Sequence, residues 1–219
     1  MDTETRQKKE SAVWNKLAAG YDERTLKTYR RAYELSIEKT AAVLALDQRV
    51  LEIGCGTGII ALGIASSVEQ VVATDISPEM ITVAQEKAAH LEITNVTFHV
   101  QDGYALPFDD ASFDTVLLFN AIHVVQQPDA LLREAHRLLK PSGHLVSATD
   151  CLGEPVPFPT RLMLGLQKLL KLLGVIPFMW YYTQEDLCRL FEQCGLEIVE
   201  TAVLHANPVN AYVLARKPA

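Results

Sequence analysis

The stretch "VLEIGCGTGII", residues 50–60, is an apolar run that leads into three glycines at alternate positions, Gly54, Gly56 and Gly58. Glycine allows tight turns and lets the backbone come close to a ligand. A dinucleotide-binding turn needs the spacing G-x-G-x-x-G, and a phosphate-binding loop needs lysine and then serine or threonine after its last glycine. Here the spacing is G-x-G-x-G, and isoleucine follows at 59 and 60. The turn therefore predicts close backbone approach to a ligand without the phosphate-binding residues of either motif.

The sequence around this turn alternates between strand-like apolar runs and helical patterns. Strands are predicted over residues 49–53, 70–75, 96–101, 113–120 and 143–150. Helices are predicted over 58–67, 78–90 and 129–139, and two runs near the C-terminus, 197–204 and 211–215, predict an antiparallel pair of strands. This alternation is typical of a parallel sheet covered on both faces. The predicted fold is α/β and doubly wound, with a mostly parallel seven-stranded sheet and an antiparallel hairpin at its edge.

The two ends of the chain differ from this alternating middle. Residues 11–46 predict one or two helices broken near Gly20. A proline-rich stretch, EPVPFP, precedes an apolar helix predicted over 160–173, and Thr183 is suited to cap a helix that runs to Cys194. We expect one domain, 1–219, with these parts: an N-terminal helical cap (1–46), a cofactor-binding core (47–150), a helical lid insertion (151–182), and a C-terminal helix with edge strands (183–219).

Composition restricts the partners and the compartment. The chain has 219 residues, of which 49% are hydrophobic and 21% charged, and its net charge is −7. An acidic chain lacks the broad basic field that attracts nucleic acid, so no nucleic-acid partner is expected. The four cysteines have no metal-ligand spacing, the N-terminus resembles no targeting peptide, and no uncharged apolar stretch reaches the length of a membrane span. These features predict a cytoplasmic protein with reduced thiols.

Three carboxylates follow or precede the predicted turns at one end of the sheet. Asp75 ends the second strand, where a carboxylate can accept both hydroxyls of a ribose. Asp102 ends the third strand and can accept from an exocyclic amine, as in adenine, and Glu52 precedes the glycines. The pattern predicts a ligand that carries a nucleoside but no pyrophosphate, and several acids around one crevice suit a ligand with positive charge.

Four motifs together carry a resemblance to a known family. "VLEIGCGTG", "ATDISPEMI", "QDGYALPFDDASFDTV" and "LLREAHRLLKPSGHL" resemble, in order and spacing, the motifs of the class I S-adenosylmethionine-dependent methyltransferases. The resemblance covers about residues 49–150. Within the family the sequence is similar to the small-molecule group that includes the ubiquinone and menaquinone biosynthesis methyltransferases, and "WNKLAAGYDE" resembles that group's N-terminal segment. The fold implied is the Rossmann-like methyltransferase fold, and the cofactor implied is S-adenosylmethionine.

The resemblance also implies the cofactor-binding residues, which are Tyr21, Glu52, Gly54, Cys55, Gly56, Gly58, Asp75, Ile76, Asp102, Gly103 and Asn120. The glycine turn would border the methionine part, and Glu52 would face its amino group directly or through water. Asp75 would hold the ribose and Ile76 would pack on the adenine.

Asp102 and the backbone of Gly103 would read the adenine edge. Asn120 would lie beside the methionine part, and Tyr21 would close over the site. Alanine is usual at position 103, and only the backbone is expected to matter there.

His123 is the candidate catalytic base, because it follows the fourth strand on the ligand side of the sheet and histidine titrates near neutral pH. The alternative is a histidine that lines the pocket or bonds within the core without moving protons. Asp109 and Asp110 invite a metal interpretation, but acids favour turns, so we expect no metal site.

The predicted activity is transfer of a methyl group from S-adenosylmethionine to a small, lipophilic acceptor at oxygen, nitrogen or carbon. The alternatives are a protein or RNA methyltransferase and a non-catalytic S-adenosylmethionine-binding protein. The apolar helix over 160–173 leaves three roles open: a lid over the acceptor, a face buried on the sheet edge or in a homodimer, and a helix in peripheral contact with a membrane.

Overall fold

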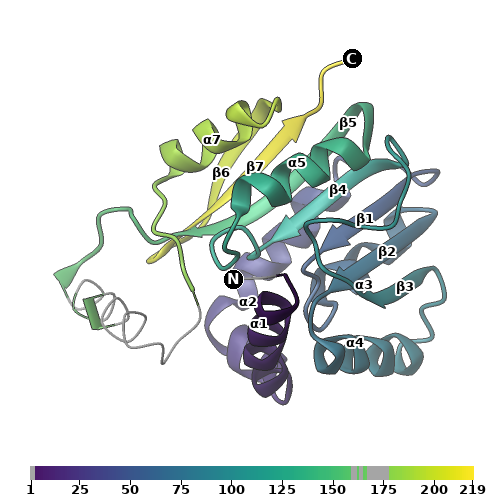
Figure 1. The fold of residues 1–219 in the computed structure, drawn as a ribbon, viewed down its shortest axis with the longest axis horizontal. Helices are drawn as coiled ribbons and strands as arrows, with labels where there is room; N and C mark the ends of the chain where they lie inside the picture. The colour runs from purple at the N-terminus through teal and green to yellow at the C-terminus, as the bar shows by residue number, and fades with distance from the viewer. Residues whose placement is uncertain (1–2, 159–161, 163–164, 167–177) are drawn as a thin grey trace.

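The computed structural model describes residues 3–158, 162, 165–166 and 178–219. Within these residues, seven strands form one sheet in the order β3-β2-β1-β4-β5-β7-β6 (Figure 1). The strands are β1 (Arg49–Ile53), β2 (Gln70–Asp75), β3 (Val96–Val100), β4 (Phe113–Phe119), β5 (Leu139–Cys151), β6 (Glu197–Ala206) and β7 (Val209–Arg216). Strands β1 to β5 are parallel, whereas β7 pairs antiparallel with both β5 and β6. The predicted mostly parallel sheet with an antiparallel edge hairpin is confirmed.

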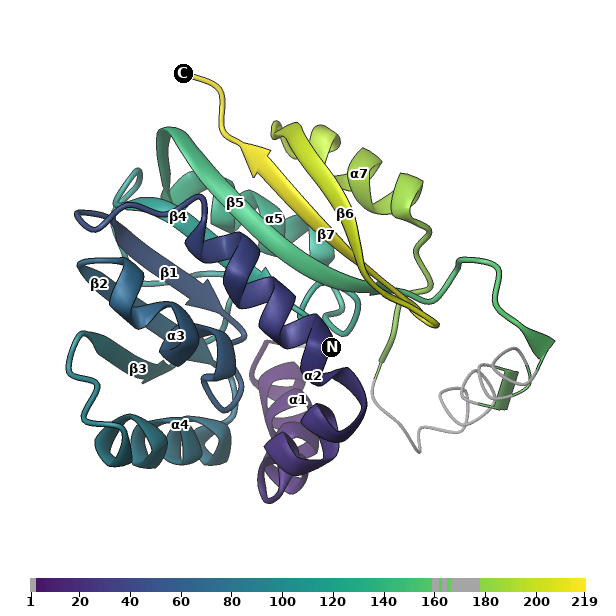
Figure 2. The same cartoon turned by 180° about the vertical axis from the view of Figure 1, so that it is seen from behind.

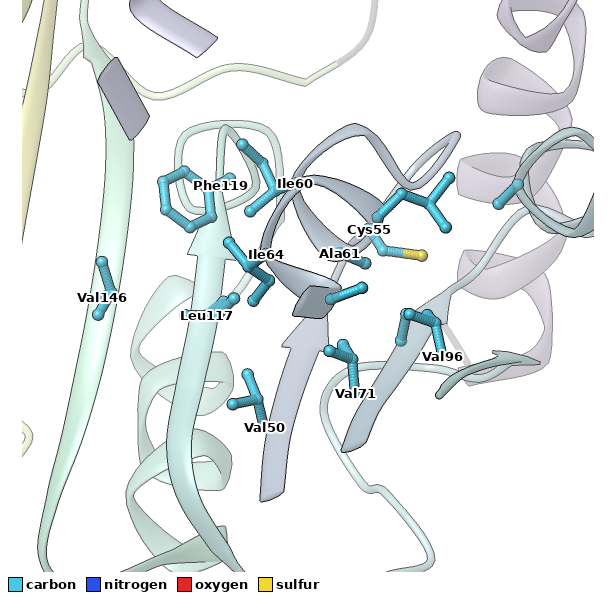
Figure 3. Packing of buried hydrophobic residues seen from close by; sticks show 14 of the residues in the cluster. Val50, Cys55, Ile60, Ala61, Ile64, Val71, Val96, Leu117, Phe119 and Val146 are labelled. Atoms are coloured by element: carbon cyan, nitrogen blue, oxygen red, sulfur yellow. The ribbon is translucent and has the colours of Figure 1, made fainter. Parts of the chain in front are cut away.

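Helices cover both faces of the sheet, as Figures 1 and 2 show from opposite sides. The described helices are α1 (Thr3–Ala18), α2 (Tyr21–Ala41), α3 (Ile59–Ile64), the 3-10 turn η1 (Ala65–Ser67), α4 (Pro78–His90), α5 (Pro128–Leu138) and α7 (Gln184–Gln193). Helices α2, α3 and α4 pack in one apolar cluster with Val50, Val71 and Leu117, part of which appears in Figure 3. Helices α5 and α7 pack in a second cluster on the opposite face. Burial on both sides explains why the central strands are continuously apolar.

Local capping chemistry sets several helix ends where the sequence predicts them. The Ser77 hydroxyl accepts from the Met80 N–H at 3.1 Å, and proline follows at the first helical position of α4. Thr183 forms a reciprocal capping box with Asp186 at the start of α7. Gly20, at φ 67°, separates α1 from α2 at the predicted break.

Several predicted boundaries differ from the structure, and among the starts of elements those of α1 and β5 differ most. The first helix begins at Thr3 rather than near residue 11, because packing of α1 against α4 orders a polar segment that has no apolar periodicity. Strand β5 begins at Leu139 rather than at residue 143. A register shift in its pairing with β4, and Ser142 at φ 62°, let the chain pass from α5 directly into the strand.

The apolar helix predicted over 160–173 lies outside the described residues, apart from Leu162, Gly165 and Leu166, which are exposed. The chain segments on either side of it are joined by a hydrogen bond, in which the Gly153 N–H donates to the Tyr182 carbonyl at 2.8 Å. None of the helices that the structure describes is both long and apolar enough to cross a membrane.

Candidate active site

A cavity of about 110 Å³ opens where β1, β2, β3 and β4 end. Most of the predicted cofactor-binding residues line it: Tyr21, Gly54, Gly56, Asp75, Ile76, Asp102, Gly103 and Asn120. This is the crevice outside the carboxyl ends of the strands where open α/β sheets bind ligands. We call it the first pocket. Trp14 and Glu10 of α1 also line it, and sequence reasoning did not find either of them.

The glycines of the turn have three different reasons to be glycine, and all three have positive φ. A Cβ on Gly54 would lie 3.1 Å from the Cβ of Ala121, whereas a Cβ on Gly56 would meet nothing within 4 Å. Because Gly56 lines the first pocket, that open space is part of the pocket. A Cβ on Gly58 would instead approach Phe98 at 3.0 Å, so Gly58 serves packing and does not line the pocket.

Asp75 is held by the turns on both sides of it. Its two oxygens accept from the Gly56 N–H at 2.8 Å and the Ser77 N–H at 2.9 Å. Burial raises the pKa of Asp75, and the backbone N–H groups partly oppose that shift. Each carboxylate oxygen has a second lone pair, so the side chain can still accept the two hydroxyls of a ribose from the pocket.

Asp102 is already engaged by helix α1. The Gln7 side chain donates to it at 2.8 Å, and Arg6 forms an ion pair with it. Arg6 also pairs with Glu10 at 2.7 Å and lies 4.4 Å from the centre of the Tyr104 ring. The sequence predicted that Asp102 reads adenine, and nothing in the local sequence signalled a partner about a hundred residues earlier in the chain.

Gly103 is constrained by packing as well as by its backbone. A Cβ there would lie 2.7 Å from Ile53 Cγ2 and 2.9 Å from Leu131 Cδ1, which is too close for an alanine without a shift of these side chains. The expectation that only the backbone matters at this position therefore needs correction. In this chain Ile53 and Leu131 fill the space that an alanine side chain would occupy.

Glu52 and Cys55 lie behind the glycine turn rather than in the first pocket. Glu52 is 1% exposed, its Oε2 has no hydrogen-bond partner among the described residues, and burial raises its pKa to about 8. Cys55 belongs to the same buried apolar cluster as Ile60 and Ala61, part of which Figure 3 draws. Burial raises the pKa of its thiol well above the ordinary value. Such a thiol is unreactive, because the thiolate is the nucleophile.

The buried Glu52 makes stability depend on pH. Its pKa of about 8 exceeds the ordinary 4.5, so the folded state binds the proton more tightly than the unfolded chain. The free energy of unfolding therefore falls as pH rises from about 4.5 to about 8, by roughly 2–3 kcal/mol between pH 5 and pH 7. Glutamine cannot ionise, so we expect Glu52→Gln to remove this fall in the free energy of unfolding. Urea titrations of both proteins at pH 5 and at pH 7 measure it. Equal falls in both proteins would show that Glu52 does not titrate in this range.

A second cavity of about 260 Å³ adjoins the first, and Trp14, Tyr21, Asn120 and Val124 line both. We call it the second pocket. It is built from α1, α2, the residues after β4, the end of β5 and the start of β7.

A hydrogen-bonded chain crosses the wall of the second pocket. The Asn210 side-chain amide donates to the Asp150 carboxylate at 2.7 Å and to the side-chain oxygen Oδ1 of Asn120 at 2.9 Å. The Asn120 amide in turn donates to the Tyr33 hydroxyl at 3.3 Å. Asn120 has φ 53°, a left-handed conformation that asparagine tolerates and that is typical of functional sites. Asn120 thus connects the two pockets in a fixed position.

His123 lines the second pocket and is 4% exposed. Burial lowers its pKa, and the charge of Asp150 partly offsets the shift. Its Nδ1 has no hydrogen-bond partner in the part of the chain that is described. The Trp180 N–H donates to the His123 carbonyl at 2.7 Å, and the Trp180 indole donates to the Val125 carbonyl at 2.9 Å. These two hydrogen bonds of Trp180 hold the end of the predicted lid insertion, residues 178–182, beside the second pocket.

Asp109 and Asp110, the acids that invite a metal interpretation, lie in the turn before β4. Asp110 pairs with Arg137 at 2.6 Å in the turn before β4. Across the described positions, no group of three or more histidine, cysteine or acidic side chains is arranged to hold a metal ion.

Comparisons with known proteins agree with this geometry. The sequence profile of the "Methyltransferase domain" family matches residues 51–147. The chain is 30% identical to a demethylmenaquinone methyltransferase of Tropheryma whipplei over 94% of this chain and 91% of that protein. It is 27% identical to a ubiquinone biosynthesis O-methyltransferase of Alkalilimnicola ehrlichii over 74% and 66% of the two chains. Magnesium protoporphyrin IX methyltransferase from Synechocystis, solved with bound SAH, has the same fold, with a TM-score of 0.74 and 20% sequence identity. The superposition covers 97% of this chain and 99% of that protein.

Fold and pocket define an α/β protein with a cavity at the carboxyl ends of its parallel strands. The chain belongs to the class I S-adenosylmethionine-dependent methyltransferases. It is therefore an enzyme of methyl transfer, and the recognised family matches the one that the sequence motifs predicted.

Proposed function

We propose that this enzyme binds S-adenosylmethionine in the first pocket and methylates a small, lipophilic acceptor in the second pocket. The observation that carries the proposal is that the two pockets adjoin and share Tyr21 and Asn120. A methyl transfer needs the donor and the acceptor in contact, and positioning alone contributes roughly 7–11 kcal/mol to such reactions.

The residues of the first pocket fit the cofactor. S-adenosylmethionine, when bound, supplies a methyl group on a positively charged sulfur. Asp75 would accept the ribose hydroxyls, and the open space over Gly56 admits the ligand close to the backbone. Glu52 lies behind the glycine turn and does not line this pocket, so no direct contact with the amino group is assigned to it. Ile76 and Met80 supply apolar walls of the same pocket.

The Asp102 carboxylate can accept from the adenine amine only at an acceptor position that the side chains of α1 leave free. Gln7 and Arg6 both donate to this carboxylate, and a carboxylate has about four acceptor positions. We therefore propose that the adenine amine binds Asp102 alongside these side chains, with α1 covering the ligand as the N-terminal cap.

His123 is proposed as the general base for acceptors that lose a proton. It is buried, its pKa is lowered, and its Nδ1 has no partner among the described residues, so the neutral ring has a nitrogen free to accept a proton. Asp150 in the same pocket partly offsets the lowered pKa and favours the protonated ring once it forms.

A lipophilic acceptor is supported by the apolar and aromatic side chains around the second pocket and by two relatives. Trp14, Val124 and three tyrosines line the pocket, and Phe178 and Trp180 pack edge-to-face beside it. One relative is named for the methylation of demethylmenaquinone and another for O-methylation in ubiquinone biosynthesis.

The proposal is tested in two steps with the whole chain. Calorimetric titration should show that S-adenosylmethionine binds and that NAD does not. The enzyme is then incubated with methyl-labelled S-adenosylmethionine and, separately, quinols, phenols, amines, protein or RNA. Label in a small organic product supports the proposal. NAD binding, label only in macromolecules, or binding without turnover on any acceptor would each contradict it.

A further inference from the structure

The charged side chains that line the second pocket differ in how far protein contacts already occupy them. Its charged lining residues are Arg24 and Asp150. The Arg24 guanidinium donates to the Ala19 carbonyl at 2.8 Å and also to the Leu17 carbonyl, so it caps the end of α1. Asp150 has one oxygen bound by Asn210, and no further hydrogen bond to its carboxylate occurs among the described residues. Arg24 is therefore bound to the carbonyls at the end of α1, whereas Asp150 keeps one carboxylate oxygen that can bind a cationic ligand.

The walls beside Asp150 are aromatic. Trp14, Tyr21, Tyr29 and Tyr33 all line the second pocket. Burial raises the pKa of Tyr29 and Tyr33, and the charge of Asp150 raises both further, so the two phenols stay neutral. Neutral aromatic rings attract cations through their faces, and aromatic cages with a nearby acid are a recurrent means of recognising ammonium groups. A neutral phenol acceptor could donate to Asp150 but would not use this property of the rings.

We propose that the acceptor is an amine with an apolar body, which the second pocket binds in its ammonium form between Asp150 and the aromatic side chains. The inference rests on the proposed function, since it names the substrate class of the same site. Asp150 binds the cation and Asn210 fixes the carboxylate. Asn210 donates both to Asp150 and to Asn120, and Asn120 also lines the first pocket. These bonds fix the position of Asp150 relative to the first pocket.

The chemistry of this acceptor balances with the groups present. His123, neutral because burial lowers its pKa, takes one proton from the ammonium nitrogen. The freed lone pair forms the nitrogen–carbon bond as the sulfur–carbon bond of the donor breaks and sulfur keeps the electron pair. The protonated ring then releases its proton to water when the product leaves.

The test compares two probes of nearly equal size, benzylamine, which is a cation near neutral pH, and benzyl alcohol, which is neutral. Each is titrated by calorimetry into the protein saturated with S-adenosylhomocysteine. We expect benzylamine to bind about 10- to 100-fold more tightly. Asp150→Asn should abolish this preference. Asp47→Asn, an equal change of charge at an exposed position before β1, should keep it.

Equal affinities in the wild type, or a preference that survives in Asp150→Asn, would overturn the inference. If circular dichroism shows that Asp150→Asn does not fold, the wild-type protein is titrated with benzylamine and with phenylacetate, an anion of similar size. Binding of benzylamine without phenylacetate supports the inference, and equal binding of the two refutes it. S-adenosylhomocysteine binding is measured in the same titrations. If it binds without a preference for the cation, only the acceptor class fails; if it does not bind, the proposed function fails.

Discussion

Replacing Asp75 with alanine is expected to weaken S-adenosylmethionine binding by about 10²- to 10⁴-fold. Hydrogen bonds to a charged group are worth about 1.5–3 kcal/mol each, and this carboxylate would lose two ribose hydroxyls. The variant also removes the acceptor of the Gly56 and Ser77 N–H groups, at 2.8 and 2.9 Å, so the glycine turn loses a fixed support. Isothermal titration of the two proteins with the cofactor measures the change.

The matched control is Glu79→Ala, which removes an exposed carboxylate four residues further along the chain. It should bind the cofactor like the wild type, since Glu79 does not line the first pocket. Circular dichroism establishes that both variants fold. An Asp75→Ala protein that keeps wild-type affinity would remove Asp75 from the cofactor site.

Replacing His123 with alanine is expected to lower kcat on the identified acceptor by about 10²- to 10⁴-fold, the usual contribution of a general base. Cofactor affinity should change little, because His123 lines the second pocket and not the first. The wild-type kcat should rise with pH, since only the neutral ring accepts a proton. The midpoint should lie below the ordinary histidine pKa of 6.5, because burial lowers the pKa of His123.

Two further variants separate catalysis from packing. His123→Asn keeps a polar side chain but has no basic nitrogen, so it should also lose turnover together with the rising limb of the pH profile. His99→Ala, at an exposed position on β3, should retain both. Wild-type turnover in His123→Asn would make His123 a wall residue of the pocket and rule out the base.

The sequence alone determined the elements and their order, because the signals for them are local. Each of these signals, which are hydrophobic periodicity, capping residues and turn glycines, depends on only a few neighbouring residues. The start of α4 at Ser77-Pro78 and the N-cap of α7 at Thr183 could therefore be recognised without a structure. The glycine turn and Asp75 could also be placed together, since consecutive parallel strands bring their carboxyl ends to one edge. The helix over residues 160–173 stays a prediction.

The tertiary structure decided which side chains meet, because those contacts join residues far apart in the chain. Arg6 reaches Asp102 only because α1 folds over the ends of the strands. Asn210 reaches Asp150 because β7 pairs antiparallel with β5 in a register that sets the two residues opposite each other. Burial is equally non-local: packing of α3 on the sheet places Glu52 and Cys55 behind the turn, away from the first pocket. Local sequence cannot encode these distances, since they depend on how helices and strands pack once all of them have formed.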